Sequence, residues 1–138
     1  MGFEWAWDDI DWIAVVVSVI ASMALGFIWY SKFAFLKSWQ EDTGMTDEKM
    51  REGNMPMMFG GMIVMVIIST IGMALLIGKG DIEAGLAIGA IVGFGIAAAR
   101  VLPQYMFAQQ PNRMALMQAI NLGIGILLTG AIIGAFNA

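Results

Sequence analysis

Five polar side chains in a mostly apolar chain have the chemistry to bind a ligand: Tyr30, Arg100, Gln104, Gln118 and Asn121. Arg100 and Gln104 are one helical turn apart, and Gln118 and Asn121 are three residues apart, so each pair shares a helix face. A guanidinium group together with amides can hold an anion. One interpretation is therefore a candidate site for an anionic lipid headgroup or a small anion.

A second interpretation requires no ligand. Arg100 would extend its guanidinium group to the membrane surface, and the amides would hydrogen-bond between helices for about 1 kcal/mol each. We favour this interpretation, because polar groups within a membrane indicate function by default only when they lie deep. Lipid retention by an Arg100→Ala variant distinguishes the two interpretations.

The residues that most enzymes use are missing. The chain has no cysteine and no histidine, which excludes thiol nucleophiles, imidazole bases and Cys/His metal sites. Adjacent carboxylates such as Glu41 and Asp42 point to different sides of a helix and make a poor acid/base pair. We therefore expect no enzymatic activity, no catalytic residue and no cofactor. Seven basic residues that form no stripe also argue against nucleic-acid binding.

Two groups of potential metal ligands have simpler explanations. Several of the thirteen methionines lie between Met55 and Met65 and could bind a soft cation such as Cu(I), but no thiolate or imidazole accompanies them. Flexible packing explains them better. The acidic residues from Glu4 to Asp11 could bind a divalent cation, whereas a solvated tail explains them without one. We predict no metal site.

The fold that must position these residues follows from hydropathy. Of the 138 residues, 59% are hydrophobic and 13% are charged, and residues 56–77 and 114–136 contain no charged side chain. A soluble helical bundle needs a polar face on each helix, which these stretches lack. The sequence therefore predicts an all-α polytopic membrane protein.

Four stretches are long enough, at about 1.5 Å per residue, to cross roughly 30 Å of hydrocarbon. We expect one membrane domain over residues 1–138, with four transmembrane helices in an antiparallel bundle and a short interfacial or cytoplasmic connection at 32–55. Pro103 should kink or end the third span. The predicted spans are about 12–31, 56–77, 82–105 and 114–136.

Small residues recur at every fourth position on three spans, and in lipid such faces let helix backbones approach closely. We expect them to support close packing and either self-association or packing beside a larger membrane partner. The predicted faces are Ala14, Ser18, Ser22 and Gly26 on the first span, Gly85, Gly89 and Gly93 on the third, and Gly130 and Gly134 on the fourth.

Orientation follows from the basic residues near the span ends. Six of the seven lie on one side of the membrane if both termini are on the other side. The positive-inside rule then places both termini on the outer, periplasmic side of the cytoplasmic membrane. Five tryptophans suit the two membrane interfaces as anchors: Trp5, Trp7, Trp12, Trp29 and Trp39.

Two stretches carry a family resemblance. The first contains Gly26, Trp29, Tyr30, Ser31, Phe35, Trp39 and Gly44, and the second contains Phe107 through Pro111, Leu116, Ile120, Asn121 and Gly123. With them the chain resembles the bacterial membrane-protein family catalogued as domain of unknown function 1761, although Lys32 replaces the proline that usually follows Trp-Tyr-Ser. The resemblance implies a four-helix fold and no known reaction.

Our first hypothesis is thus a small integral membrane protein with a structural or assembly role. Its partners would be the lipid bilayer and further copies of the chain, or a larger membrane complex. The alternative is a transporter, channel or lipid-binding protein that uses the polar cluster at the cytoplasmic half. A transporter should have a charged or broken-helix site near the midplane of the membrane. The midplanes of all four predicted spans are apolar, which argues against transport by a single copy of the chain.

Overall fold

The computed structural model describes residues 7–29, 36–44 and 46–137. Trp5, Tyr30 and the side chain of Trp39 lie outside the described part, as do Ser31 and Phe35 of the family pattern. The described residues form helices and short connections, with no strand among them. The elements are η1 (Trp7–Asp9), α1 (Trp12–Trp29), α2 (Leu36–Thr43), α3 (Asp47–Glu52), α4 (Met55–Ile77), α5 (Ile82–Ala90), η2 (Ile91–Ala98), α6 (Ala99–Phe107) and α7 (Asn112–Phe136).

Four helical stretches are long and apolar enough to cross a membrane, which confirms the predicted four-helix fold. They are α1, α4 from Pro56, the continuous α5–η2–α6 segment, and α7. Local signals set their ends. Asn54 accepts a hydrogen bond from the Met57 amide at 3.2 Å, and Asp81 accepts one from the Ala84 amide at 3.0 Å, so each side chain caps a helix start.

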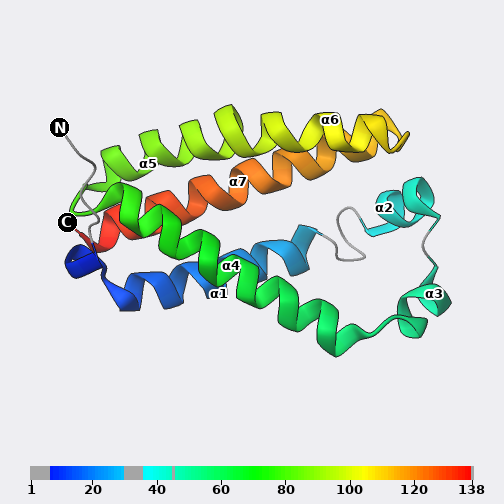
Figure 1. Ribbon diagram of the computed structural model, residues 1–138, viewed down its shortest axis with the longest axis horizontal. Coiled ribbons are helices and arrows are strands. Elements are labelled where there is room, and N and C mark those ends of the chain that lie inside the picture. The colour runs from blue at the N-terminus through cyan, green and yellow to red at the C-terminus, as the bar shows by residue number, and fades with distance from the viewer. Residues whose placement is uncertain (1–6, 30–35, 45, 138) are drawn as a thin grey trace.

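Figure 1 shows that one end of the structure holds both termini and that the other end carries the short helices α2 and α3. The start of α1, the turn between α4 and α5, and the end of α7 lie together at one end, where the Asn137 amide donates to the carbonyl oxygens of Gly78 and Gly80 at 2.9 Å each. In the turn, Gly78 has a φ of 57°, which favours glycine. The opposite end carries α2, α3 and the turn between α6 and α7.

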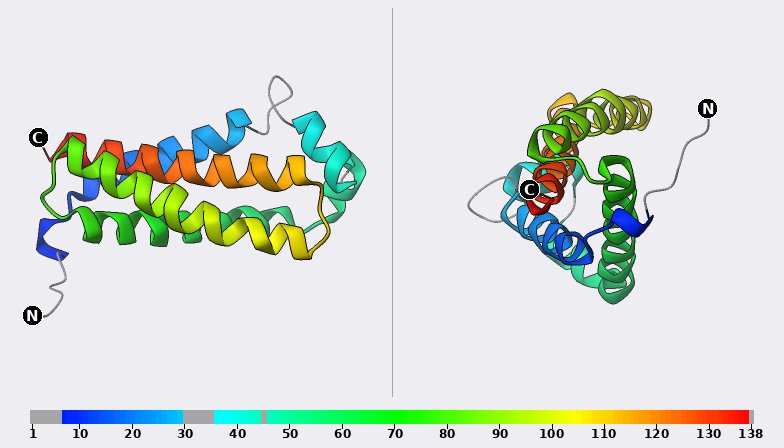
Figure 2. Two further views of the ribbon diagram at one scale, coloured as in Figure 1. Left: turned by 90° about the horizontal axis from the view of Figure 1, so that it is seen from above. Right: turned by 90° about the vertical axis from the view of Figure 1, so that its left-hand side faces the viewer.

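The third span packs closely against α7 beyond the middle of the molecule, where Gly93 meets Gly123, but α4 joins the packed core only near the end that holds the termini. The core cluster there joins η1–α1, α4 and α7 through residues such as Val15, Met73 and Ile133. Away from it, α4 diverges from α5 and α6 (Figures 1 and 2). From Met57 to Ser69 every residue of α4 is exposed except half-buried Val66. This half of α4 therefore has little protein around it.

The predicted glycine faces of the third and fourth spans meet each other within the chain. A Cβ on Gly85 would overlap the carbonyl oxygen of Gly130, and a Cβ on Gly89 would lie 3.0 Å from the Leu127 Cα. A Cβ on Gly134 would lie 2.5 Å from the carbonyl oxygen of Asp81. Backbones packed this closely leave no room for a second chain between these faces.

The small-residue face of α1 is divided. Ala14 and Ser18 are buried, and Ser22 forms a hydrogen bond with α7. Gly26, in contrast, has open space where a side chain would be. The part of this face from Ala14 to Ser22 therefore packs against the rest of the chain, whereas its end at Gly26 does not.

The third span does not end at Pro103, one of the two outcomes that the sequence predicted there. The helix continues through Pro103 to Phe107, and the irregular part is η2, a π-helical stretch that ends at Ala98. A proline removes one backbone donor and clashes with the preceding turn. Here α6 packs against α7, so tertiary contacts keep the segment helical despite the lost hydrogen bond.

Candidate functional site

A cavity of about 500 Å³ lies between α1, α4 and α7, at the point where α4 diverges from the others. Five of its lining residues carry a hydroxyl or amide group. Ser22 comes from α1, Ser69 and Thr70 come from α4, and Asn121 and Thr129 come from α7. Three helices therefore bring polar groups to one place inside an apolar protein.

The hydroxyl groups at the inner end of the cavity are bonded within the protein. The Thr129 hydroxyl donates to the Gly125 carbonyl at 3.0 Å, so the 3.3 Å contact between Ser22 and Thr129 requires Ser22 to be the donor. Thr70 donates to the Val66 carbonyl at 2.7 Å. The protons of these three hydroxyls are thus already used, and each oxygen keeps a free lone pair.

Two donors remain. Within the described part of the chain, neither the Asn121 amide nor the Ser69 hydroxyl has a hydrogen-bond partner, and both line the cavity. An amide or hydroxyl kept from water without a partner costs roughly 1–3 kcal/mol by protein mutation data, and more in hydrocarbon. A polar group of a ligand, or water, would recover this free energy.

The rest of the wall that the described residues form is apolar and uncharged. It includes three methionines, Met23, Met62 and Met65, together with leucine, valine and isoleucine side chains. Met62 and Met65 line the cavity and are also 41% and 62% exposed, so the cavity opens sideways along α4. A lipophilic molecule in a surrounding bilayer could enter the cavity along α4 without passing through the packed core.

One turn of α1 before Ser22, the hydroxyl of Ser18 is an unpaired polar group. Ser18 is fully buried, and no described residue bonds its oxygen. The polar stripe of α1 therefore continues from the cavity into the packed end of the protein. A buried hydroxyl without a partner is uncommon in folded proteins.

Sequence reasoning did not find this site. A charged residue was the expected sign of a site near a midplane, and the midplanes have none. The polar groups that line this cavity are hydroxyls and one amide instead. A signal was present, because Ser69 and Thr70 are the only polar side chains in residues 56–77. A serine or threonine in a helix usually bonds its own backbone, so this signal does not by itself predict a cavity.

The structure separates the residues of the predicted lipid or anion site. Asn121 lines the cavity between α1, α4 and α7, whereas Gln104 lines a second cavity of about 390 Å³ between α6 and α7. Arg100 is exposed and lines neither cavity, and Gln118 is half-buried. Tyr30 lies outside the described residues. One residue of each predicted pair, Gln104 and Asn121, thus faces a different cavity.

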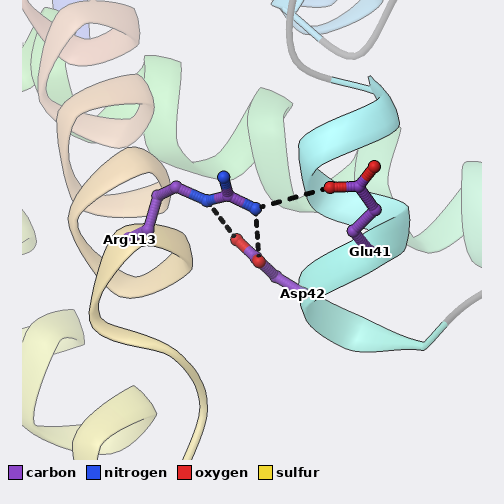
Figure 3. A network of polar contacts seen from close by, with 3 residues as sticks. All are labelled: Glu41, Asp42 and Arg113. Atoms are coloured by element: carbon purple, nitrogen blue, oxygen red, sulfur yellow. Dashed lines mark hydrogen bonds and ion pairs between the residues drawn. The ribbon is translucent and has the colours of Figure 1, made fainter.

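An ion pair that the sequence did not predict joins α2 to the start of α7 (Figure 3). The Arg113 guanidinium donates to both carboxylate oxygens of Asp42, at 2.6 and 3.0 Å, and lies 3.8 Å from Glu41. The hydrogen bond from Arg113 lowers the pKa of Asp42 below its usual value. The partners are 71 residues apart, so no local pattern could reveal the pair.

The role of the tryptophans as interfacial anchors stays a prediction. Trp7 and Trp12 are exposed at the end that holds the termini, and Trp29 is half-buried at the far end of α1. Among the described residues, no group of three or more carboxylates could hold a metal ion.

The comparison with protein families gives one match. A family described as "Protein of unknown function (DUF1761)" matches residues 13–134, which is most of the chain, and confirms the resemblance seen in the sequence. No curated protein and no solved structure matches the chain.

Proposed function

Because the chain belongs to the DUF1761 family, whose function is unknown, we propose a function from its cavity: an integral membrane protein that binds a neutral lipophilic molecule inside the bilayer. The observation that carries this proposal is a pair of donors, Asn121 and Ser69, that have no hydrogen-bond partner among the described residues and line a mostly apolar cavity. Binding proteins commonly combine such walls with a few polar groups that orient the ligand.

The size and charge of the cavity narrow the ligand. A volume of about 500 Å³ is within the usual range for small-molecule sites. Among the described residues, no charged side chain lines the cavity, so a charged head group would lose its hydration without compensation from them. The ligand is therefore neutral, with a polar part that meets Asn121 and Ser69 and an apolar part that leaves along α4.

The distribution of charge supports the bacterial cytoplasmic membrane, with both termini on the periplasmic side. Lys79 lies at the end that holds the termini, beside Asp9 at 3.6 Å, while Lys37, Lys49, Arg100 and Arg113 belong to the opposite end. The positive-inside rule places that basic end in the cytoplasm. With no native cysteine, Lys79→Cys and Lys37→Cys variants test this directly. An impermeant maleimide added to intact cells should label Cys at 79 and not at 37, and the reverse pattern would refute the orientation.

A cavity-filling variant tests the binding function. Gly125 lines the cavity, and a Cβ there would meet only the Leu25 Cδ2 atom, at 3.8 Å, so Gly125→Leu fills space without a backbone clash. Gly95→Leu, at an open position outside the cavity, is the matched control. Protein purified in mild detergent should carry a neutral lipophile that organic extraction releases from wild type and Gly95→Leu but not from Gly125→Leu. Equal amounts in all three would contradict the proposal.

Self-association, or packing beside a larger membrane partner, is a second candidate function. The glycine faces of α5, η2 and α7 are occupied within the chain, so these faces do not support it. The exposed half of α4 does, because Gly60 and Gly61 have open space and leave its backbone accessible. The mass of the purified particle in mild detergent tests this candidate. A monomer without a bound protein would exclude it.

A further inference from the structure

The polar groups of the cavity narrow the ligand beyond a neutral lipophile. We infer that the cavity between α1, α4 and α7 selects a quinone-type head group, that is, a flat ring with carbonyl acceptors and an apolar tail. This inference rests on the binding function proposed above. It identifies the chemical class that Asn121, Ser69 and the cavity methionines would recognise together.

The balance of donors and acceptors is the first argument. Ser22, Thr70 and Thr129 have committed their protons to protein acceptors, while the protons of Asn121 and Ser69 have no acceptor among the described residues. Asn121 is half-buried and Ser69 is exposed on α4, and a donor that faces the bilayer interior without a partner is costly. The protons of Asn121 and Ser69 outnumber the Asn121 amide oxygen as unbonded groups, so a ligand that brings acceptors satisfies more of them than one that brings donors, and a carbonyl group does so.

The methionine side chains are the second argument. Met23, Met62 and Met65 come from two helices and line the same cavity. Thioether sulfur atoms make favourable contacts with flat conjugated rings, and the unbranched side chain adapts to the ring. An alkyl head group would make only nonspecific apolar contacts with these methionines. The methionines thus favour a ring over a simple chain at this position.

The opening of the cavity accounts for the tail. Met62 and Met65 line the cavity and are exposed on α4, next to a half-helix that is exposed from Met57 to Ser69. A ring held at Asn121 and Ser69 can extend an apolar tail past these methionines into the bilayer. The described residues that line the cavity do not titrate near neutral pH, so they hold the ring without exchanging protons with it.

The test uses the full-length protein in nanodiscs and two probes with the same short isoprenoid tail, one ending in a benzoquinone and one in a primary alcohol. Equilibrium binding is measured for wild type, Asn121→Leu, Ser69→Ala and the control Gln104→Leu, which alters the other cavity. The quinone should bind wild type more tightly than the alcohol does. Loss of a hydrogen bond should weaken quinone binding about tenfold in Asn121→Leu and less in Ser69→Ala, with no change in Gln104→Leu.

A spectroscopic measurement on wild type keeps the test independent of variant folding. Hydrogen bonding to Asn121 should shift the carbonyl stretch of bound quinone to lower wavenumber than in empty lipid, and an unshifted band would overturn the inference. Alcohol binding as tight as quinone binding would also overturn it, while leaving the lipophile cavity in place. If neither probe binds and Gly125→Leu loses no extracted lipophile, the proposed function itself fails.

Discussion

Gly85 of α5 and Gly130 of α7 lie so close together that a methyl group on either would overlap the carbonyl oxygen of the other. The obstacle on each side is backbone, which cannot move aside as a flexible side chain can. This contact fixes the third span against the fourth. It also defines the rigid side of the cavity, because α7 supplies Asn121 and Thr129.

Alanine at either glycine should therefore destabilise the protein. We expect Gly85→Ala and Gly130→Ala each to lower the free energy of unfolding by about 1–3 kcal/mol, the usual cost of overpacking. Thermal unfolding in detergent measures the effect. Gly95→Ala is the control on the same span, where nothing lies within 4 Å of the added Cβ, and its stability should stay equal or rise slightly. Equal losses in all three variants would show that the close approach is not the cause.

Asn137 should hold the end of α7 to the turn between α4 and α5. Its amide nitrogen donates to the carbonyls of Gly78 and Gly80. Asn137→Leu removes both hydrogen bonds, and we expect a loss of about 2 kcal/mol in unfolding free energy at about 1 kcal/mol per bond. Asn112→Ala at the exposed start of α7 should change stability by less than about 0.5 kcal/mol. An Asn137→Leu variant as stable as wild type would mean that the carbonyls find other donors.

Ser18 provides a prediction of the opposite sign. Its buried hydroxyl has no partner among the described residues, so Ser18→Ala removes an unsatisfied group at little cost in packing. We expect the unfolding free energy to rise by about 1 kcal/mol. Chemical unfolding of the two proteins side by side makes the comparison. A clear loss of stability would reveal a bound water or ligand at the hydroxyl.

The pair between Asp42 and Arg113 should make the docking of α2 depend on pH. Arg113 lowers the pKa of Asp42 from the usual 3.8, so the pair stabilises docking above that pH and is lost as the pH falls through the lowered value. Spin labels at Lys37→Cys and Leu116→Cys report the distance from α2 to α7. The distance distribution should be narrow at neutral pH and broad in strong acid.

Two variants separate the partners of Arg113. Asp42→Asn should broaden the distance distribution already at neutral pH. Glu41→Gln should not, because its 3.8 Å contact joins two exposed side chains and such pairs contribute little. A distribution that stays narrow in Asp42→Asn would show that other contacts hold α2 in place.

The fold could be predicted from hydropathy because four long apolar stretches leave few other structures for the chain. The small-residue faces were also visible, since a spacing of four residues puts Gly85, Gly89 and Gly93 on one side of a helix. The helix that packs against these faces could not be predicted, because the spacing of small residues does not indicate which helix will cover them. In the structure the partner of Gly85, Gly89 and Gly93 is α7 of the same chain.

The candidate site was harder to predict for two physical reasons. Asn121 was recognised as polar, but its assignment to the same pocket as Gln104 assumed that the two helices turn these residues toward one space. Ser22 was assigned to a helix-packing face, and Ser69 and Thr129 gave no separate signal, because isolated hydroxyls in apolar helices normally bond their own backbone. Their convergence depends on where α4 leaves α1 and α7, which is a tertiary feature.

An experimental structure of the protein purified from its membrane tests the central claim most directly. The account predicts density between Asn121 and Ser69 that continues past Met62 and Met65 along α4 and belongs to a neutral lipophile. A structure in which α4 closes onto α1 and α7, with Asn121 and Ser69 bonded to the protein and no space between the helices, would contradict it.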